Sequence, residues 1–179
     1  MNWKDVYELP TSSTGTHVSW PYLEKFLQIE MQAGLNIDPD YQREHVWTTE
    51  QQRLYVEYCI SGGDASRTIY TTSIGQKCGE WLEYNLLDGK QRLEAVRSFM
   101  SGRLGILRDD NKPDGYKVSD FSGNMDRMRC YFNWVTVKTV DRADQLGLYL
   151  RINTGGTPHS PEEIARVKVM WQEAMKGRK

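Results

Sequence analysis

The sequence has no long apolar run, and this absence argues against a protein built on membrane-spanning helices. None of its 179 residues lies in a stretch that approaches the roughly 18 or more apolar residues of a transmembrane helix. The first ten residues have neither the basic start nor the apolar run of an export signal. We therefore expect a soluble, cytoplasmic protein with no membrane partner.

Cysteine and histidine are also scarce, with three of each. Cys59, Cys78 and Cys130 are widely spaced and odd in number, which argues against a disulfide framework and against a CxxC metal site. No two histidines have the i, i+4 spacing that places two zinc ligands on one face of a helix. We expect reduced thiols and no zinc site.

The chain has no excess of charge of either sign. Its 23 Lys and Arg residues oppose 24 Asp and Glu residues, so the formal net charge is −1. Many nucleic-acid-binding proteins have a global basic bias that this chain lacks, so any recognition of phosphate must be local. With 39% hydrophobic and 26% charged residues, the composition is globular and the length fits one ordinary domain.

Apolar periodicity and cap residues predict alternating helices and strands, with no internal repeat. The first residues end in a small polar cluster, 11–16, that is typical of a loop. We therefore expect an N-terminal arm over residues 1–18 and one folded domain over residues 19–179. The expected strands are 67–74, the run that ends at Asp88, and 130–140; the expected helices begin near Pro21, Thr49, Gly89, Asp141 and Pro161.

The centre of the chain carries the clearest chemical signal. An alternating run through Leu86 meets the sequence Asp88-Gly89-Lys90-Gln91-Arg92, and a helical pattern follows. This order predicts a strand, a sharp turn and a helix, with Asp88 at or near the helix N-cap. Free amides at a helix start, together with Lys90 and Arg92, form the kind of site that binds phosphate. The alternative is a capped helix with two solvated basic side chains.

Two other segments are candidates for the same site. The first is the irregular stretch around Gln42 and Arg43, where Arg43 would be a second cationic arm. Alternatively, neighbouring aromatic residues pin this loop and Arg43 makes an ordinary surface salt bridge, which contributes little. The second is residues 151–157, which we expect to fold back against the central motif. The alternative there is a plain helix end, because glycine is the commonest C-cap residue.

A polar stretch, residues 108–123, separates the central motif from the last predicted strand. It is rich in Asp, Gly and Lys, so we expect a surface excursion. Its adjacent acids, Asp109 and Asp110, are of a type that binds hard cations, although such runs are more often solvated.

The three segments together resemble the N-terminal domain of GmrSD-type modification-dependent restriction enzymes and related phage-defence proteins. That family has a Gln-Arg pair with a nearby Trp, a central Asp-Gly-Gln-Gln-Arg, and a later Arg-Ile-Asn-Thr-Gly-Gly. The resemblance runs from about Ile37 to Ile164. Here Lys90 replaces the first Gln of the central motif, which keeps a donor and adds a charge. No His-Asn-His nuclease domain precedes Lys179, so the chain alone is not expected to cut DNA by that route.

The resemblance implies an α+β fold of the ParB/sulfiredoxin-like type, with a mixed sheet surrounded by helices. It also implies nucleotide binding and, in several members, nucleoside triphosphate hydrolysis that licenses a nuclease partner. Asp88 and Gln91 are then the expected catalytic residues, and Asp88 the expected ligand of Mg²⁺ bound with the nucleotide. The expected substrate-binding residues are Gln42, Arg43, Gly89, Lys90, Arg92, Arg151, Asn153 and Gly155.

Two alternative functions are compatible with the same residues. One is a DNA-binding or DNA-processing module, because Lys and Arg cluster near each motif. The other is a non-catalytic phage or prophage protein that binds a host defence complex. Nucleotide binding distinguishes both from the first hypothesis, since a ligand at 100 times its dissociation constant adds roughly 2.7 kcal/mol to stability.

Overall fold

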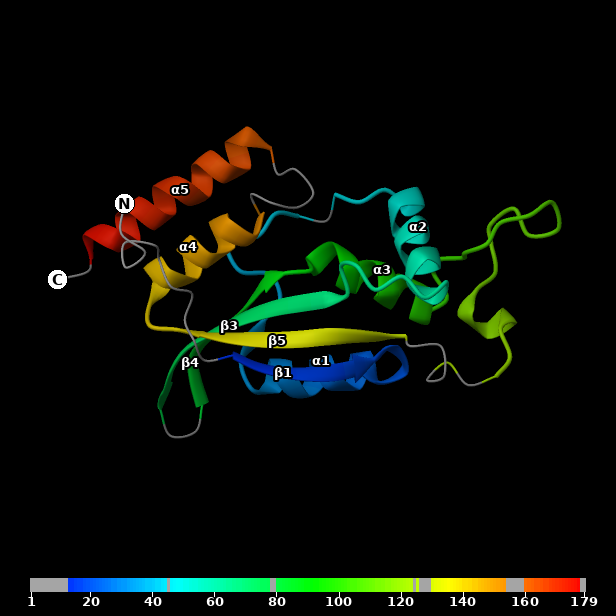
Figure 1. Cartoon of the computed structure of the whole chain (residues 1–179), viewed down its shortest axis with the longest axis horizontal. Coiled ribbons are helices and arrows are strands. Elements are labelled where there is room, and N and C mark those ends of the chain that lie inside the picture. The colour runs from blue at the N-terminus through cyan, green and yellow to red at the C-terminus, as the bar shows by residue number, and fades with distance from the viewer. Residues whose placement is uncertain are drawn as a thin grey trace.

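The computed structural model describes residues 13–44, 46–77, 80–123, 125, 130–153 and 160–177. They form a five-stranded mixed sheet with helices on both faces, which confirms a single α+β domain (Figure 1). Among the residues that the structure describes, no helix is long and apolar enough to cross a membrane. The elements are β1 Ser13–Ser19, η2 Trp20–Tyr22, α1 Leu23–Gln32, β2 Leu35–Asn36, α2 Thr49–Ile60, β3 Thr68–Lys77, β4 Glu80–Asp88, α3 Lys90–Met100, η3 Val118–Asp120, β5 Tyr131–Thr139, α4 Arg142–Asn153 and α5 Pro161–Lys176.

The strand order is β1-β5-β3-β4-β2, so β3 lies at the centre. β3 pairs antiparallel with β4 and parallel with β5, while β1 pairs antiparallel with β5 and β2 parallel with β4. The register slips between Tyr70 and Thr71 opposite the end of β4. This irregularity lies next to the turn that begins α3.

Two apolar clusters cover the two faces of the sheet. Successive residues of a strand point to opposite faces, and in β4 Leu86 belongs to one cluster while Leu87 belongs to the other. The first cluster includes buried residues of α1, α2 and α3, and the second includes buried residues of α4 and α5. The end of β4 therefore has one helical layer on each side.

Several predicted elements are confirmed by their caps. Thr48 and Gln51 form a capping box at the start of α2, with the Thr48 hydroxyl accepting from the Gln51 amide at 3.2 Å. Ser160 and Glu163 do the same at α5. The β3–β4 hairpin and β5 also lie where the sequence predicts them.

Two local predictions are wrong. Residues 13–16 form part of β1 instead of a loop, because β5 supplies a backbone partner to a polar segment at the sheet edge. The helix α4 continues through Asn153 instead of breaking at Arg151. Asp88 is the last residue of β4 and lies next to Gly89, the N-cap of α3, which agrees with the prediction that it lies at or near the cap. The predicted boundary between an arm and a domain at residue 19 stays a prediction.

Candidate functional site

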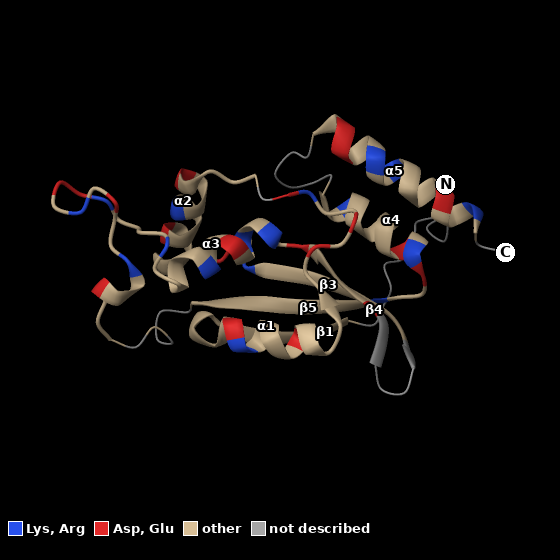
Figure 2. Cartoon of the chain, turned by 180° about the vertical axis from the view of Figure 1, so that it is seen from behind, with Lys and Arg blue, Asp and Glu red and all other residues tan. Residues whose placement is uncertain are grey.

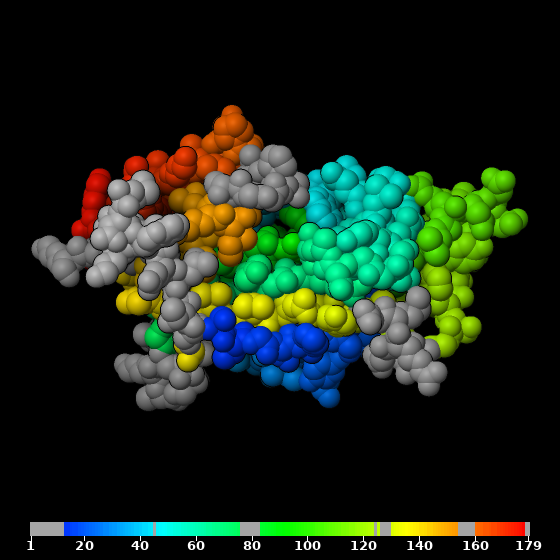
Figure 3. Space-filling model, in the orientation of Figure 1, coloured from blue at the N-terminus to red at the C-terminus, as the bar shows by residue number. Residues whose placement is uncertain are grey.

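A cavity of about 280 Å³ opens at the turn between β4 and α3. Figure 3 shows a hollow between α4, in orange, and α2, in cyan, with green atoms in its depth. The volume is near the lower end of the range of small-molecule sites. The cavity is lined by Gln42, Arg43, Trp47, Tyr55, Ser66, Asp88, Gly89, Lys90, Gln91, Arg92, Ile152 and Asn153.

The turn itself depends on Gly89. This residue has φ +109°, a left-handed backbone conformation that residues other than glycine rarely adopt. A Cβ atom there would also lie 2.4 Å from Cδ1 of Ile69, which is fully buried. Gly89 thus lets the chain turn sharply from β4 into α3 and places the first amides of the helix beside the cavity.

Asp88 and Arg92 form an ion pair across this turn. The Arg92 Nη2 atom donates to Asp88 Oδ2, and the two side chains are 15% and 27% exposed. Among the residues that the structure describes, Nε of Arg92 is buried without a hydrogen-bond partner. Arg92 is therefore less exposed than the sequence suggested, and it keeps a donor that no described protein group uses.

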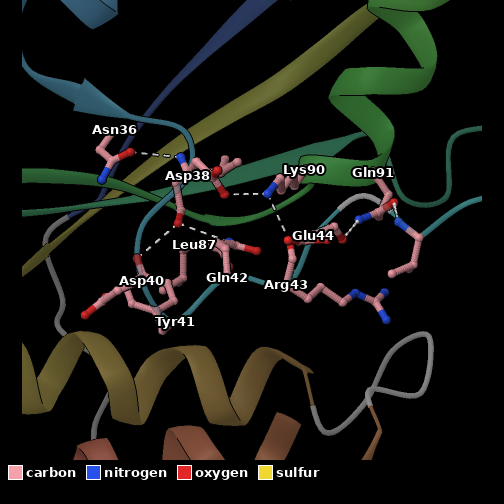
Figure 4. A network of polar contacts seen from close by, with 12 residues as sticks. Asn36, Asp38, Asp40, Tyr41, Gln42, Arg43, Glu44, Leu87, Lys90 and Gln91 are labelled. Carbon is pink, nitrogen blue, oxygen red and sulfur yellow. Dashed lines mark hydrogen bonds and ion pairs between the residues drawn. The ribbon is translucent and has the colours of Figure 1, made fainter.

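Lys90 bonds the segment that precedes α2. Its Nζ atom donates to Asp38 Oδ1 at 2.5 Å and to the Arg43 carbonyl oxygen at 3.0 Å. The residue predicted to bind phosphate thus also fixes the backbone of a second predicted residue (Figure 4).

The Gln91 side chain is buried, and its amide group also bonds the backbone of the segment that precedes α2. Its Oε1 atom accepts from the amides of Val46 and Trp47 at 3.0 and 3.1 Å, and its Nε2 atom donates to the Glu44 carbonyl at 3.1 Å. An oxygen that already accepts two backbone bonds has both lone pairs engaged. The geometry is that of a residue that positions the cavity wall, and the catalytic role expected of Gln91 stays a prediction.

Gln42 and Arg43 play different parts. Gln42 Nε2 donates to the carbonyls of Leu86 and Leu87 at 3.1 and 2.9 Å, which ties it to β4. Figure 4 shows the Arg43 side chain extending away from this network. Its guanidinium makes no hydrogen bond or ion pair with the residues that the structure describes, so the surface salt bridge offered as its alternative is not found there.

An aromatic pair forms another wall. The Trp47 and Tyr55 rings lie 5.4 Å apart, centroid to centroid, at an interplanar angle of 57°. The Tyr55 hydroxyl donates to the Ser66 carbonyl at 3.1 Å, and burial raises the pKa of this tyrosine. Tyr55 therefore stays a neutral donor. Sequence reasoning missed Tyr55 and Ser66, because neither lies in one of the three motifs; Ser66 has a left-handed backbone, with φ +61°.

The end of α4 contributes only part of the third predicted segment. Ile152 and Asn153 line the cavity, whereas Arg151 lines a separate depression with Trp171 of α5. Consecutive helical residues are rotated by about 100°, so positions 151 and 153 point in very different directions. The expectation that both converge on Gly89 is confirmed for Asn153 and wrong for Arg151. Gly155 lies outside the described residues.

Carboxylates are few in this cavity. Asp88 is the one acidic residue among its described lining residues, and no group of three or more His, Cys, Asp or Glu residues that could hold a metal ion occurs in the described ranges. A Mg²⁺ ion bound with nucleotide phosphates needs only one or two protein carboxylates. The donor set therefore fits such an ion only when a phosphate-bearing ligand supplies the remaining oxygens.

These features define a class: a single α+β domain whose strand–glycine–helix turn opens into a cationic, partly aromatic cavity. A family model described as the GmrSD restriction endonuclease, N-terminal domain, matches residues 23–170, and the chain belongs to that family. No curated protein and no solved structure matches the chain. The ParB/sulfiredoxin likeness therefore stays a prediction.

Proposed function

We propose that this chain binds a nucleoside triphosphate in the cavity at the β4–α3 turn and hydrolyses it as part of a restriction-type defence system. One observation carries the proposal. The cavity combines the Arg43 guanidinium, which bonds no other described residue, and the Arg92 side chain, whose buried Nε has no partner among the described residues, with an aromatic wall.

The cationic side of the cavity suits phosphate oxygens. Arg43, Lys90 and Arg92 come from two segments far apart in the sequence, and α3 adds the positive end of its dipole. Charge-assisted bonds from guanidinium groups to phosphate are among the stronger hydrogen bonds in proteins. The three side chains are thus able to bind a chain of phosphates.

The aromatic side favours a nucleotide over a bare anion. A planar base stacks on an indole with a favourable energy that depends little on base identity, and Trp47 is held beside α3 by Gln91. In addition, Figure 2 shows positions of Lys and Arg interspersed with positions of Asp and Glu along the helices.

Hydrolysis assigns a role to Asp88. A ligand phosphate that takes Arg92 releases the Asp88 carboxylate, which is then available to hold Mg²⁺ or to accept a hydrogen bond from the attacking water. Bound Mg²⁺ would supply charge neutralisation of the phosphate oxygens. Asn153 and the backbone amides at the Gly89 turn would complete the phosphate and sugar contacts.

Family membership suggests the biological setting. A domain of the GmrSD restriction endonuclease family would couple the nucleotide state to a nuclease partner or to DNA. The alternative function, binding to a host defence complex, requires no nucleotide. A measurement of nucleotide binding therefore distinguishes this alternative from the proposed function.

The test compares a nucleoside triphosphate with inorganic tripolyphosphate, each with and without Mg²⁺, by titration calorimetry. We expect both to bind, and the nucleotide to bind more tightly. Trp47→Leu should weaken only the nucleotide, by about tenfold, since base stacking contributes about 1–3 kcal/mol. Arg43→Ala should weaken both ligands.

Arg43→Ala is the cleanest probe of phosphate binding because the Arg43 guanidinium bonds no other described residue. Arg92→Ala should also abolish tight binding, but it leaves Asp88 without its partner and so changes the empty site too. If neither tripolyphosphate nor any nucleoside triphosphate binds the wild-type chain, the proposed function is wrong.

A further inference from the structure

A residue outside all three motifs holds the segment that carries Arg43. Arg166 lies on α5, and its Nη1 atom donates to the Asp40 carbonyl at 2.7 Å. Its Nη2 atom donates to the Tyr41 carbonyl at 3.3 Å and to the Gln42 carbonyl at 3.4 Å. One guanidinium therefore bonds the three residues immediately before Arg43.

The two next carbonyls are bonded by the central motif. The Arg43 carbonyl oxygen accepts a hydrogen bond from Nζ of Lys90, and the Glu44 carbonyl oxygen accepts one from Nε2 of Gln91. Every carbonyl from Asp40 to Glu44 thus accepts a hydrogen bond from a side chain of α3 or α5. An irregular segment has no strand or helix partner for these groups, so such donors determine its shape.

A ligand in the cavity would affect the donors on α3 and the donor on α5 differently. Phosphate oxygens in the cavity would compete for Lys90, which lines it, and so weaken the bond to the Arg43 carbonyl. Arg166 does not line the cavity. Its three bonds are the ones that remain when the site is filled.

We propose that Arg166 is a positioning residue that fixes the backbone of residues 40–42 so that the Arg43 side chain is presented to the ligand. The proposal rests on the proposed function, in which Arg43 binds phosphate. Because α5 also packs against α4, which lines the cavity through Ile152 and Asn153, Arg166 links ligand binding to the position of α5. By linkage, any partner that shifts α5 must change the affinity for the ligand, and ligand binding must change the affinity for that partner.

A double-mutant cycle tests this role, with tripolyphosphate and a nucleoside triphosphate as ligands. Arg166→Ala should weaken binding about fivefold, because hydrogen bonds from charged groups contribute modestly at exposed positions. In an Arg43→Ala background the same substitution should have no further effect. A residue that acted on binding independently of Arg43 would show additive effects, because independent sites add.

Two variants serve as controls. Lys168→Ala removes the same charge from an exposed position of the same helix and should leave binding unchanged. Arg166→Lys keeps the charge but loses the planar fork that reaches several carbonyls, so it should weaken binding nearly as much as Arg166→Ala. Equal binding of Arg166→Ala and wild type, or additivity with Arg43→Ala, overturns the proposal.

Hydrogen exchange of the ligand-free protein separates this proposal from the proposed function. Arg166→Ala should accelerate exchange at the Gln42 amide, which donates to the Pro39 carbonyl at 2.9 Å, while Lys168→Ala should not. Unchanged exchange at Gln42 overturns the positioning role. If the wild type binds no nucleotide, the proposed function fails, and exchange alone decides whether Arg166 holds the segment.

Discussion

Two irregular segments of this chain look alike in sequence and are held in different ways. Residues 37–48 and residues 109–123 are both polar and both lack long regular elements. In the first, side chains of α3 and α5 reach backbone groups up to 126 residues away in sequence. In the second, the described side-chain hydrogen bonds of residues 109–123 join residues no more than eight positions apart. Arg108, which immediately precedes this segment, makes the long-range contact there, with Glu50 of α2.

The difference indicates which irregular segment is built for function. Local bonds make a compact surface turn at low entropic cost, whereas bonds between distant elements fix a segment relative to the rest of the domain. Only the 37–48 segment presents side chains to the cavity, through Gln42, Arg43 and Trp47. Long-range bonding of a loop is therefore the structural mark of the candidate site.

The largest effect should come from a matched pair of glycine substitutions, one at the site and one in the 109–123 segment. Gly89 and Gly123 have nearly the same φ, +109° and +107°, but a Cβ meets Ile69 at the first and open space at the second. Gly123→Ala should cost about 1 kcal/mol for the left-handed backbone alone. Gly89→Ala should cost about 3 kcal/mol, because steric overlap in a packed core is added.

Chemical denaturation of both variants measures this difference directly. Equal free energies of unfolding would mean that the Ile69 side chain yields without cost and that Gly89 is required for its conformation only.

A smaller effect is expected when one bond donor is removed from each segment. Gln91→Met should lower the free energy of unfolding by about 2 kcal/mol, because the amides of Val46 and Trp47 lose their acceptor, the buried side chain of Gln91. Lys112→Met removes an exposed contact with Asp120 and should change stability by less than about 0.5 kcal/mol. Hydrogen exchange should rise at Val46 and Trp47 in the first variant and only near Lys112 in the second.

One result would contradict the conclusion that hydrogen bonds from α3 hold the 37–48 segment. If Gln91→Met leaves exchange at Trp47 unchanged, the 37–48 segment is held by its aromatic contacts and not by hydrogen bonds from α3.

The smallest effect is a pH response confined to the 109–123 segment. The Tyr116 hydroxyl, and then the amides of Lys112 and Asn111, hold the pKa of Asp109 below its ordinary value. A lowered pKa means that the charged form stabilises the fold at pH above the ordinary value of about 3.9, and that this contribution is lost as the pH falls through the folded-state pKa. The 109–123 segment should therefore loosen in acid, while the hydrogen bonds between the Gln91 side chain and the 37–48 segment persist.

An NMR titration from neutral to acid pH follows this response at individual amides. The amides of Asn111 and Lys112 should shift at lower pH than those beside an unperturbed aspartate, and Val46 should not follow them. Titration at the ordinary pKa of Asp would show that the bond from Tyr116 is not formed in solution.

Much of the fold was predictable because its signals are local. Cap residues at Thr48 and Ser160, and the alternation in β5, act within a few positions of the chain. β1 was missed because its Ser, Thr and Gly residues resemble a loop until β5 pairs with them. Its strand character comes from a distant partner.

The candidate site was predictable to a lesser degree, for the same reason. Motif residues indicated Asp88, Arg92 and Asn153, but the local pattern ended α4 too early and so misplaced Arg151. No feature of the sequence indicated that Arg166 contributes to the site, since an exposed arginine on an amphipathic helix is typical of a solvated face. Its contacts span more than a hundred residues of sequence.

The ion pairs at the cavity have a consequence for selectivity. Arg92 already faces Asp88, and Lys90 already faces Asp38. Under the proposed function these carboxylates would compete with an entering anion for Lys90 and Arg92, so an anion would gain most when it carries more charge than the groups it displaces. A singly charged ion would find Arg43 without an ion-pair partner among the described residues, whereas a polyphosphate would replace both carboxylates at once. The cavity would thus favour ligands of high charge over simple anions.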